Sequence, residues 1–118
     1  MLPRLVSPAV ATEQPRLVDR LRRIIAANDS RGLAAASLAM ARRANFTPLL
    51  PAIDCPTLLI VGREDVVSPP AEMASMAAAI AAARLVEIPG AGHLSPMERP
   101  NEVNAAILDF LAELERRA

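Results

Sequence analysis

The sequence has few aromatic residues, a single cysteine and no lysine. Aromatic residues make up 2% of its 118 residues, so a hydrophobic core has to be built from alanine, leucine, valine, isoleucine and methionine. The single cysteine, Cys55, excludes an internal disulfide. Its place beside Pro56, at the start of an apolar run, favours a small buried side chain over a catalytic thiol. No apolar stretch has the length of a signal peptide or a membrane span, so we expect a soluble, cytoplasmic protein without a membrane partner.

Net charge is also lacking. Thirteen arginines balance thirteen aspartates and glutamates, with the arginines concentrated in the first half of the chain and the acids in the second. We interpret this asymmetry as solvated helix surfaces, which commonly carry such charges. Because there is no overall positive charge to attract phosphates, we do not expect nucleic acid as a partner.

The first half of the chain has helical patterns. Met1–Ala11 contains two prolines and is expected to be irregular, with Thr12 as the cap of the following helix. Apolar residues recur at helical spacing over Glu13–Ala27, and a second helix is predicted over Leu33–Arg43 after a break at Asn28–Ser30. The two helices are expected to form a helical hairpin.

The second half has the pattern of an α/β fold. The apolar run Thr57–Val61 is bounded by Pro56 and Gly62, which suits a strand covered by helices on both faces of a parallel sheet. A second strand is predicted over Arg84–Ile88, with a helix over Ala71–Ala82 between the two. A last helix begins near Pro100, and its expected core stripe is Val103, Ile107, Leu111 and Leu114.

Two titratable residues follow these strands. Asp65 comes just after the first strand and His93 just after the second. The C-terminal ends of parallel strands open into one crevice, so we expect the two side chains to lie within hydrogen-bonding reach, roughly 2.6 to 3.2 Å between heavy atoms. A lone histidine is more often structural than catalytic, but acid–base pairs of this kind cluster at active sites. Glu64 is the alternative acid, although its position one residue earlier would aim its side chain differently.

The residues around this pair resemble the α/β-hydrolase family. Gly62 to Asp65 is similar to the family's Gly-x-x-Asp after its penultimate strand, and Gly90 to His93 is similar to its Gly-x-Gly-His after the last. The resemblance implies that Asp65 is the acid and His93 the general base of a catalytic triad. It also implies that Gly90 and Gly92 form the turn that presents the imidazole. The loop and helix after His93 continue the likeness.

The family's nucleophile is absent from this pattern. No Gly-x-Ser-x-Gly motif is present between a strand and a helix, and the oxyanion-hole loop is missing too. The sequence therefore resembles the C-terminal portion of an α/β-hydrolase, with residues 1–50 as a cap-like helical segment and residues 51–118 as the C-terminal part of the core. An alternative nucleophile is Ser30, which has Gly32 two residues later but Asn28 in place of the first glycine. It would give the chain order Ser, Asp, His. However, a helical pattern precedes Ser30, and Arg31 would occupy the position that forms the oxyanion hole.

The resemblance implies a hydrolase of small carboxylic esters or lactones that supplies the acid and the base, without cofactor or metal. Carbon–carbon hydrolases, haloperoxidases and dehalogenases of the family share the Asp and His, so the substrate stays open. The alternative function is that of a non-enzymatic α/β module that oligomerises or binds a partner chain.

Nothing in residues 1–56 supplies a neighbour for the strand at Thr57–Val61, whose exposed edge is then a template for pairing. We therefore expect either a homo-oligomer or a complex with an N-terminal hydrolase fragment.

Overall fold

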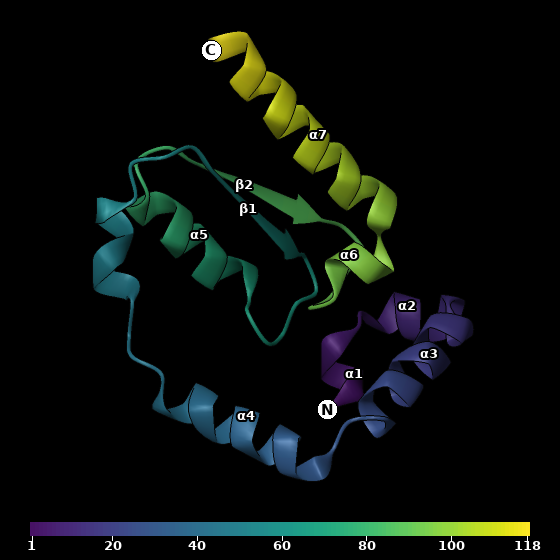
Figure 1. Ribbon diagram of the computed structural model, residues 1–118. Coiled ribbons are helices and arrows are strands. Elements are labelled where there is room, and N and C mark those ends of the chain that lie inside the picture. The colour runs from purple at the N-terminus through teal and green to yellow at the C-terminus, as the bar shows by residue number, and fades with distance from the viewer.

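The chain forms an arc of helices beside a two-stranded parallel sheet (Figure 1). The structure is a computed structural model that describes residues 1–118. Its elements in chain order are α1 (Leu2–Leu5), α2 (Pro8–Glu13), α3 (Pro15–Ala26), α4 (Ser30–Arg42), the 3-10 helix η1 (Thr47–Ala52), β1 (Thr57–Gly62), α5 (Pro70–Ala79), β2 (Ala83–Ile88), α6 (Ser95–Glu98) and α7 (Pro100–Arg117). No helix combines the length and the apolar composition that crossing a bilayer requires.

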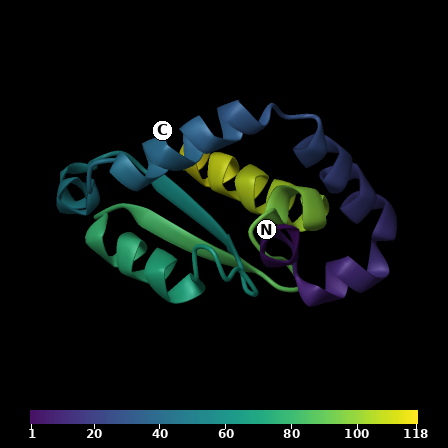
Figure 2. The same ribbon diagram turned by 90° about the horizontal axis from the view of Figure 1, so that it is seen from below.

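The two strands pair in parallel along their whole length. Thr57 is opposite Ala83 and Gly62 is opposite Ile88, which confirms the predicted α/β architecture. The helix between the strands, α5, lies on one face of the sheet and α7 on the other (Figure 2). β1 pairs only with β2, so its other edge has no neighbouring strand.

Two small cores hold these elements together. On the α7 side of the sheet, Ile88, Ala91 and Val103 are buried together, with Ile60 and Val86 packed against them. A second core joins the N-terminal helices to the segment that follows β2. It consists of Val6, Val10 and Leu21, with Leu2, Leu17, Leu94 and Met97 packed around them. The N-terminal helices are thus docked on the loop and helix beyond His93.

The prediction of an irregular N-terminus is wrong, because residues 1–11 form α1 and most of α2. The prolines of this region lie in the first turns of helices, where a missing N–H removes no helical hydrogen bond. Ser7 caps α2 by accepting a hydrogen bond from the backbone N–H of Val10 at 3.2 Å. Thr12 lies inside α2 and donates its hydroxyl to the Pro8 carbonyl, so it is not the predicted cap.

The predicted helical hairpin is not formed. α4 turns away from α3 and continues the arc (Figure 1), and it buries no residue. The expected core stripe of α7 is also only partly buried, since Val103 is covered but Ile107 and Leu111 are exposed. Cys55 is exposed as well, contrary to the expected burial. In each case the apolar pattern is present, but no other segment of these 118 residues lies over it.

Much apolar surface is consequently open to solvent. Only 17 of 118 residues are buried. The chain exposes large hydrophobic side chains at its first residue, on α3, α4, η1 and α7, and in the segments before η1 and after β1. These exposed residues are Met1, Ile24, Leu33, Leu38, Met40, Phe46, Leu49, Val66, Val67, Ile107, Leu108 and Leu111.

Candidate active site

The two segments that leave the sheet remain paired beyond the ends of the strands. The backbone N–H of Arg63 donates to the Ile88 carbonyl, and that of Glu64 donates to the Ala91 carbonyl, each at 2.9 Å. The segment after β1 therefore runs alongside the segment after β2. Glu64 remains exposed, whereas Asp65 is turned inward and is 6% exposed. Asp65, rather than Glu64, is the acid that reaches His93.

The carboxylate of Asp65 is held by three hydrogen bonds. Its Oδ1 accepts the backbone N–H of Val67 at 2.8 Å and of Ser68 at 2.9 Å, and its Oδ2 is 3.0 Å from Nδ1 of His93. Burial by itself would raise the pKa of this carboxyl. The hydrogen bonds from Ser68, His93 and Val67 and the attraction of His93 outweigh burial, so that the pKa of Asp65 lies below its ordinary value.

The loop after β2 presents the imidazole of His93. Gly90 has a φ of 66°, a left-handed conformation that suits glycine, and it turns the chain so that His93 meets Asp65. An ionised carboxylate only accepts hydrogen bonds, so Nδ1 carries the proton in the contact with Asp65. Nε2 has no hydrogen-bond partner in the chain, which leaves its lone pair free in the neutral ring.

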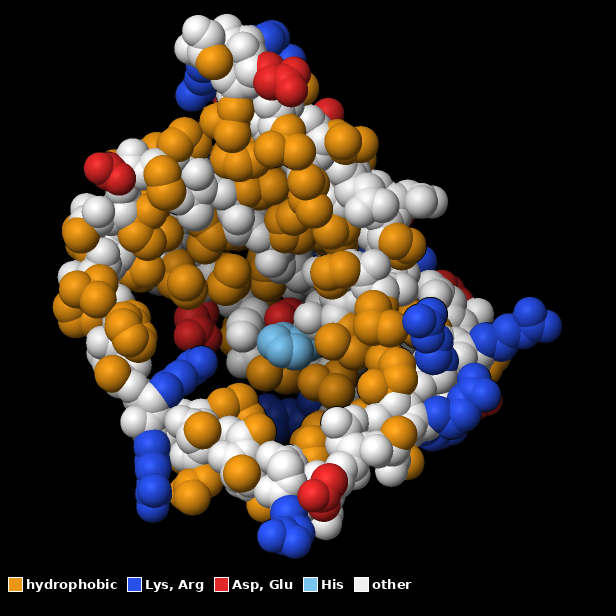
Figure 3. Space-filling view, viewed as in Figure 1, with side chains coloured by type: hydrophobic (Ala, Val, Ile, Leu, Met, Phe, Trp, Pro, Cys, Tyr) orange, Lys and Arg blue, Asp and Glu red, His pale blue; other side chains and the backbone are white.

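A cavity of about 170 Å³ lies beside the pair. Figure 3 shows the chain's one histidine, in pale blue, at the surface beside a hollow in the middle of this face. Two hydroxyl residues, Ser68 and Ser95, share the cavity with His93, but neither hydroxyl is hydrogen-bonded to the ring. Ser30 is the first residue of α4 and follows the end of α3 closely. It therefore lacks the strand–turn–helix context of a nucleophile elbow.

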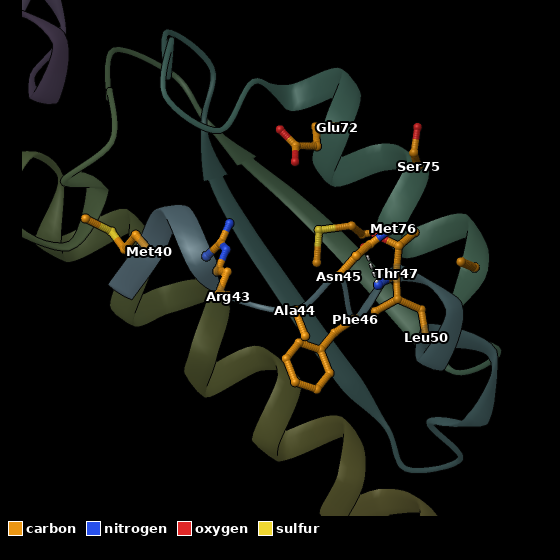
Figure 4. Close-up of a pocket in the computed structure, with 11 residues that line it drawn as sticks. Met40, Arg43, Ala44, Asn45, Phe46, Thr47, Leu50, Glu72, Ser75 and Met76 are labelled. Atoms are coloured by element: carbon orange, nitrogen blue, oxygen red, sulfur yellow. Dashed lines mark hydrogen bonds between the residues drawn. The ribbon is translucent and has the colours of Figure 1, made fainter. Parts of the chain in front are cut away.

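A larger cavity, of about 560 Å³, lies elsewhere. Figure 4 shows its lining, which comes from the end of α4, the segment leading into η1, η1 itself and α5. Its lining is mixed, with apolar side chains such as Met40, Phe46 and Met76 beside the charged Arg43 and Glu72. Neither Asp65 nor His93 contributes to it. Size alone would point to this cavity, but Asp65 and His93 line the smaller one.

One buried acid of the site carried no signal in the sequence. The side chain of Glu98 accepts hydrogen bonds from the backbone N–H groups of Ser7, Gly92 and Leu94. Glutamate is rarely buried unless it is paired, and nothing in the local pattern distinguishes Glu98 from the exposed acids around it. Only the fold brings its donors together.

These observations define a class of protein. The chain contains a parallel β–α–β unit with an acid after the first strand and a histidine after the second, joined by a hydrogen bond at the C-terminal edge of the sheet. This is the geometry of an acid–base pair in an α/β enzyme fold. The sequence model of the alpha/beta hydrolase family matches residues 2–106, and the chain belongs to that family.

Solved structures of longer proteins share this fold over part of their length. A thermophilic esterase from Thermogutta terrifontis, in its malate-bound structure, is 44% identical with a TM-score of 0.91, over 96% of this chain and 42% of that one. The enol-lactonase from Burkholderia xenovorans LB400 is 32% identical with a TM-score of 0.86, over 94% and 42%. A Mycobacterium tuberculosis protein that bears the name non-heme bromoperoxidase BpoC is 40% identical over 75 residues, or 64% of this chain and 29% of that protein. The chain thus spans less than half the length of these relatives.

Proposed function

We propose that Asp65 and His93 are the acid and the base of a Ser-Asp-His triad that hydrolyses carboxylic esters or lactones. The observation that carries this proposal is the 3.0 Å contact between Asp65 Oδ2 and His93 Nδ1. It orients the ring and fixes its tautomer, so that Nε2 is the nitrogen that can take a proton. The likeness to a named esterase and a named enol-lactonase supports the substrate class.

The reaction follows the general triad mechanism. A serine hydroxyl transfers its proton to Nε2 of His93 while its oxygen bonds to the carbonyl carbon of the substrate. His93 then gives this proton to the leaving oxygen as the ester or lactone bond breaks. Water, deprotonated in turn by His93, attacks the acyl carbon, and His93 returns this proton to the serine oxygen as the acyl-serine bond breaks and the carboxylic acid leaves. Throughout, Asp65 holds the ring and stabilises the imidazolium.

The serine is proposed to come from a segment outside these 118 residues. No hydroxyl of the chain is hydrogen-bonded to His93, and the chain spans 42% of the esterase that it resembles. In this proposal residues 1–50 are a cap-like segment and residues 51–118 the C-terminal part of the core. The position of α1 beside the C-terminal ends of the strands supports that division (Figure 1).

The open edge of β1 supports a second candidate function, which is binding of another polypeptide. The strand is apolar and unpaired on one side, and such an edge can accept a further strand. Two sources of that further strand are the nucleophile-bearing portion of a hydrolase and a second copy of this chain. Only the first would complete an active site.

A chimera tests the catalytic proposal. In it, these 118 residues replace the matched region of the Thermogutta terrifontis esterase, which supplies the remaining fold. The chimera is expected to hydrolyse a p-nitrophenyl ester, and His93→Ala is expected to lower kcat by about 10⁴-fold or more. A folded chimera that hydrolyses the ester equally well with alanine at position 93 would refute the role of His93.

A further inference from the structure

The carboxylate of Glu98, the last residue of α6, is buried among backbone donors. Glu98 is 1% exposed. Its Oε1 is 3.0 Å from the backbone nitrogen of Gly92 and 3.1 Å from that of Leu94. Its Oε2 is 3.0 Å from the same Gly92 nitrogen and 2.7 Å from that of Ser7. Gly92 and Leu94 are the residues on either side of His93, so one carboxylate holds the backbone N–H groups of both neighbours of the histidine.

We propose that Glu98 is a positioning residue that fixes the His93 loop in the orientation that meets Asp65, and that it does so by clamping this loop to the N-terminal segment. The inference rests on the proposed function only in taking His93 as the base. Glu98 has no part in the proton transfers, because its oxygens contact peptide groups and not the imidazole.

The chemistry of the side chain suits this role. An ionised carboxylate has two acceptor oxygens with about four lone-pair sites and no donor, which matches three converging N–H groups. Hydrogen bonds to an ionised group are shorter and stronger than those between neutral groups. Glutamine has the same shape but only one acceptor oxygen, and its amide N–H groups would face other donors. A buried donor left without a partner is costly, so the loop would have to move.

The clamp extends to the start of the chain. The hydroxyl of Ser7 donates to the Gly90 carbonyl at 3.0 Å, and the backbone N–H of Leu94 is also 3.1 Å from the Leu5 carbonyl. The side-chain amide of Gln14 donates to the Glu98 carbonyl at 3.2 Å. The segment from Leu5 to Gln14 is therefore bonded to the loop on both sides of His93. The same hydrogen bonds therefore dock this segment and hold the loop that carries the histidine.

The test uses NMR of the full chain labelled with ¹⁵N, in which His93 gives the only imidazole signals. The unmodified chain is expected to show a slowly exchanging Nδ1 proton. In Glu98→Gln the signal of this proton is expected to broaden because the proton exchanges with water, and the ring nitrogens are expected to move toward tautomer-averaged shifts. The amides of Gly92 and Leu94 are expected to lose at least tenfold in hydrogen-exchange protection. Amides of β1 are expected to keep theirs. The matched control is Glu102→Gln, at an exposed acid of α7, which should leave all these signals unchanged.

A folded Glu98→Gln chain with an unchanged imidazole signature would overturn the proposal, since a purely structural glutamate would leave the ring signals in place.

A second pair of variants covers the case in which Glu98→Gln does not fold. Ser7 has a φ of −66°, which proline adopts, so Ser7→Pro removes the 2.7 Å donor and displaces the carboxylate. Ser7→Ala removes only the hydroxyl. Ser7→Ala loses the bond to the Gly90 carbonyl but keeps the backbone donor to Glu98. The Nδ1 signature is therefore expected to be lost in Ser7→Pro and to be weakened less in Ser7→Ala, and equal spectra would refute the clamp. Neither readout needs hydrolysis, so an inactive chimera would refute the proposed function and leave this inference standing.

Discussion

The carbonyl oxygen of Gly92 occupies the space that a side chain at Gly62 would need. The last residue of β1 and the residue before His93 thus touch through their backbones. This contact brings the segment that carries Asp65 against the segment that carries His93, and it requires the absence of a Cβ atom at position 62.

Gly62→Ala should therefore destabilise the chain, because the new methyl group collides with a rigid backbone that cannot rotate away. We expect the free energy of unfolding to fall by about 1 to 3 kcal/mol, measured by urea denaturation. The control is Gly32→Ala on α4, where nothing lies within 4 Å of the added atom. That substitution should be stabilising by about 0.5 to 1 kcal/mol, since alanine favours helix over glycine. Equal effects at the two positions would contradict the close approach.

Asp65 should make stability depend on pH. Its pKa in the folded chain lies below the ordinary value of 3.8, so the folded state binds this proton more weakly than the unfolded chain does. The resulting stabilisation is complete well above pH 3.8 and is lost as the pH falls through the folded-state pKa. Asp65→Asn is expected to lower the free energy of unfolding by about 1 to 3 kcal/mol at pH 7. In denaturation series from pH 7 to pH 3, the difference should shrink at the acid end, and a constant difference would count against the prediction.

The isolated chain should show no hydrolysis that depends on His93. A base and its orienting acid accelerate little when nucleophile and oxyanion donors are missing, because the parts of a triad act as a unit. Turnover of p-nitrophenyl acetate by the purified chain is expected to equal that of His93→Ala and of Ser30→Ala. Clear turnover that is lost in both variants would make Ser30 the nucleophile.

The purified chain should self-associate when no nucleophile-bearing portion is present. β1 has an open edge, and α7 exposes Leu108 and Leu111, at 65% and 48%. Sedimentation at increasing concentration is expected to detect a dimer or larger species. Leu108→Glu should weaken it at least tenfold, since a buried unpaired charge is costly. Ala118→Glu adds the same charge at the exposed C-terminus and should have no such effect. A monomer at every concentration would show that these surfaces need no partner.

The sheet and the contact between Asp65 and His93 could be predicted from the sequence because their signals are local. An uninterrupted apolar run identifies β1, and the rule that parallel strands share one C-terminal edge brings Asp65 to His93 although 28 positions separate them. The N-terminal helices could not be predicted in this way. The prolines of this region are typical of interruptions in a helix. The region becomes part of the fold through the capping bond of Ser7 and through the packing of the three helices α1, α2 and α3 against the loop that follows His93.

Two other features depend on contacts that no local pattern encodes. The donors of Glu98 include Ser7, 91 positions away, so its burial follows from the tertiary fold alone. The apolar periodicity of α7 identifies a face that can be buried, but it does not say what covers that face. Within these 118 residues Ile107 and Leu111 remain exposed.

The central claim is that Asp65 and His93 work as the acid and base of a hydrolase, and kcat of Asp65→Asn in the esterase chimera tests it most directly. Asparagine keeps the shape of the side chain but can stabilise the wrong tautomer of the ring. We predict that kcat falls by about 10⁴-fold with KM nearly unchanged, while Glu64→Gln, one residue earlier and exposed, retains full activity. A folded Asp65→Asn chimera that keeps kcat within about tenfold of the parent, or a loss of activity in Glu64→Gln instead, would contradict it.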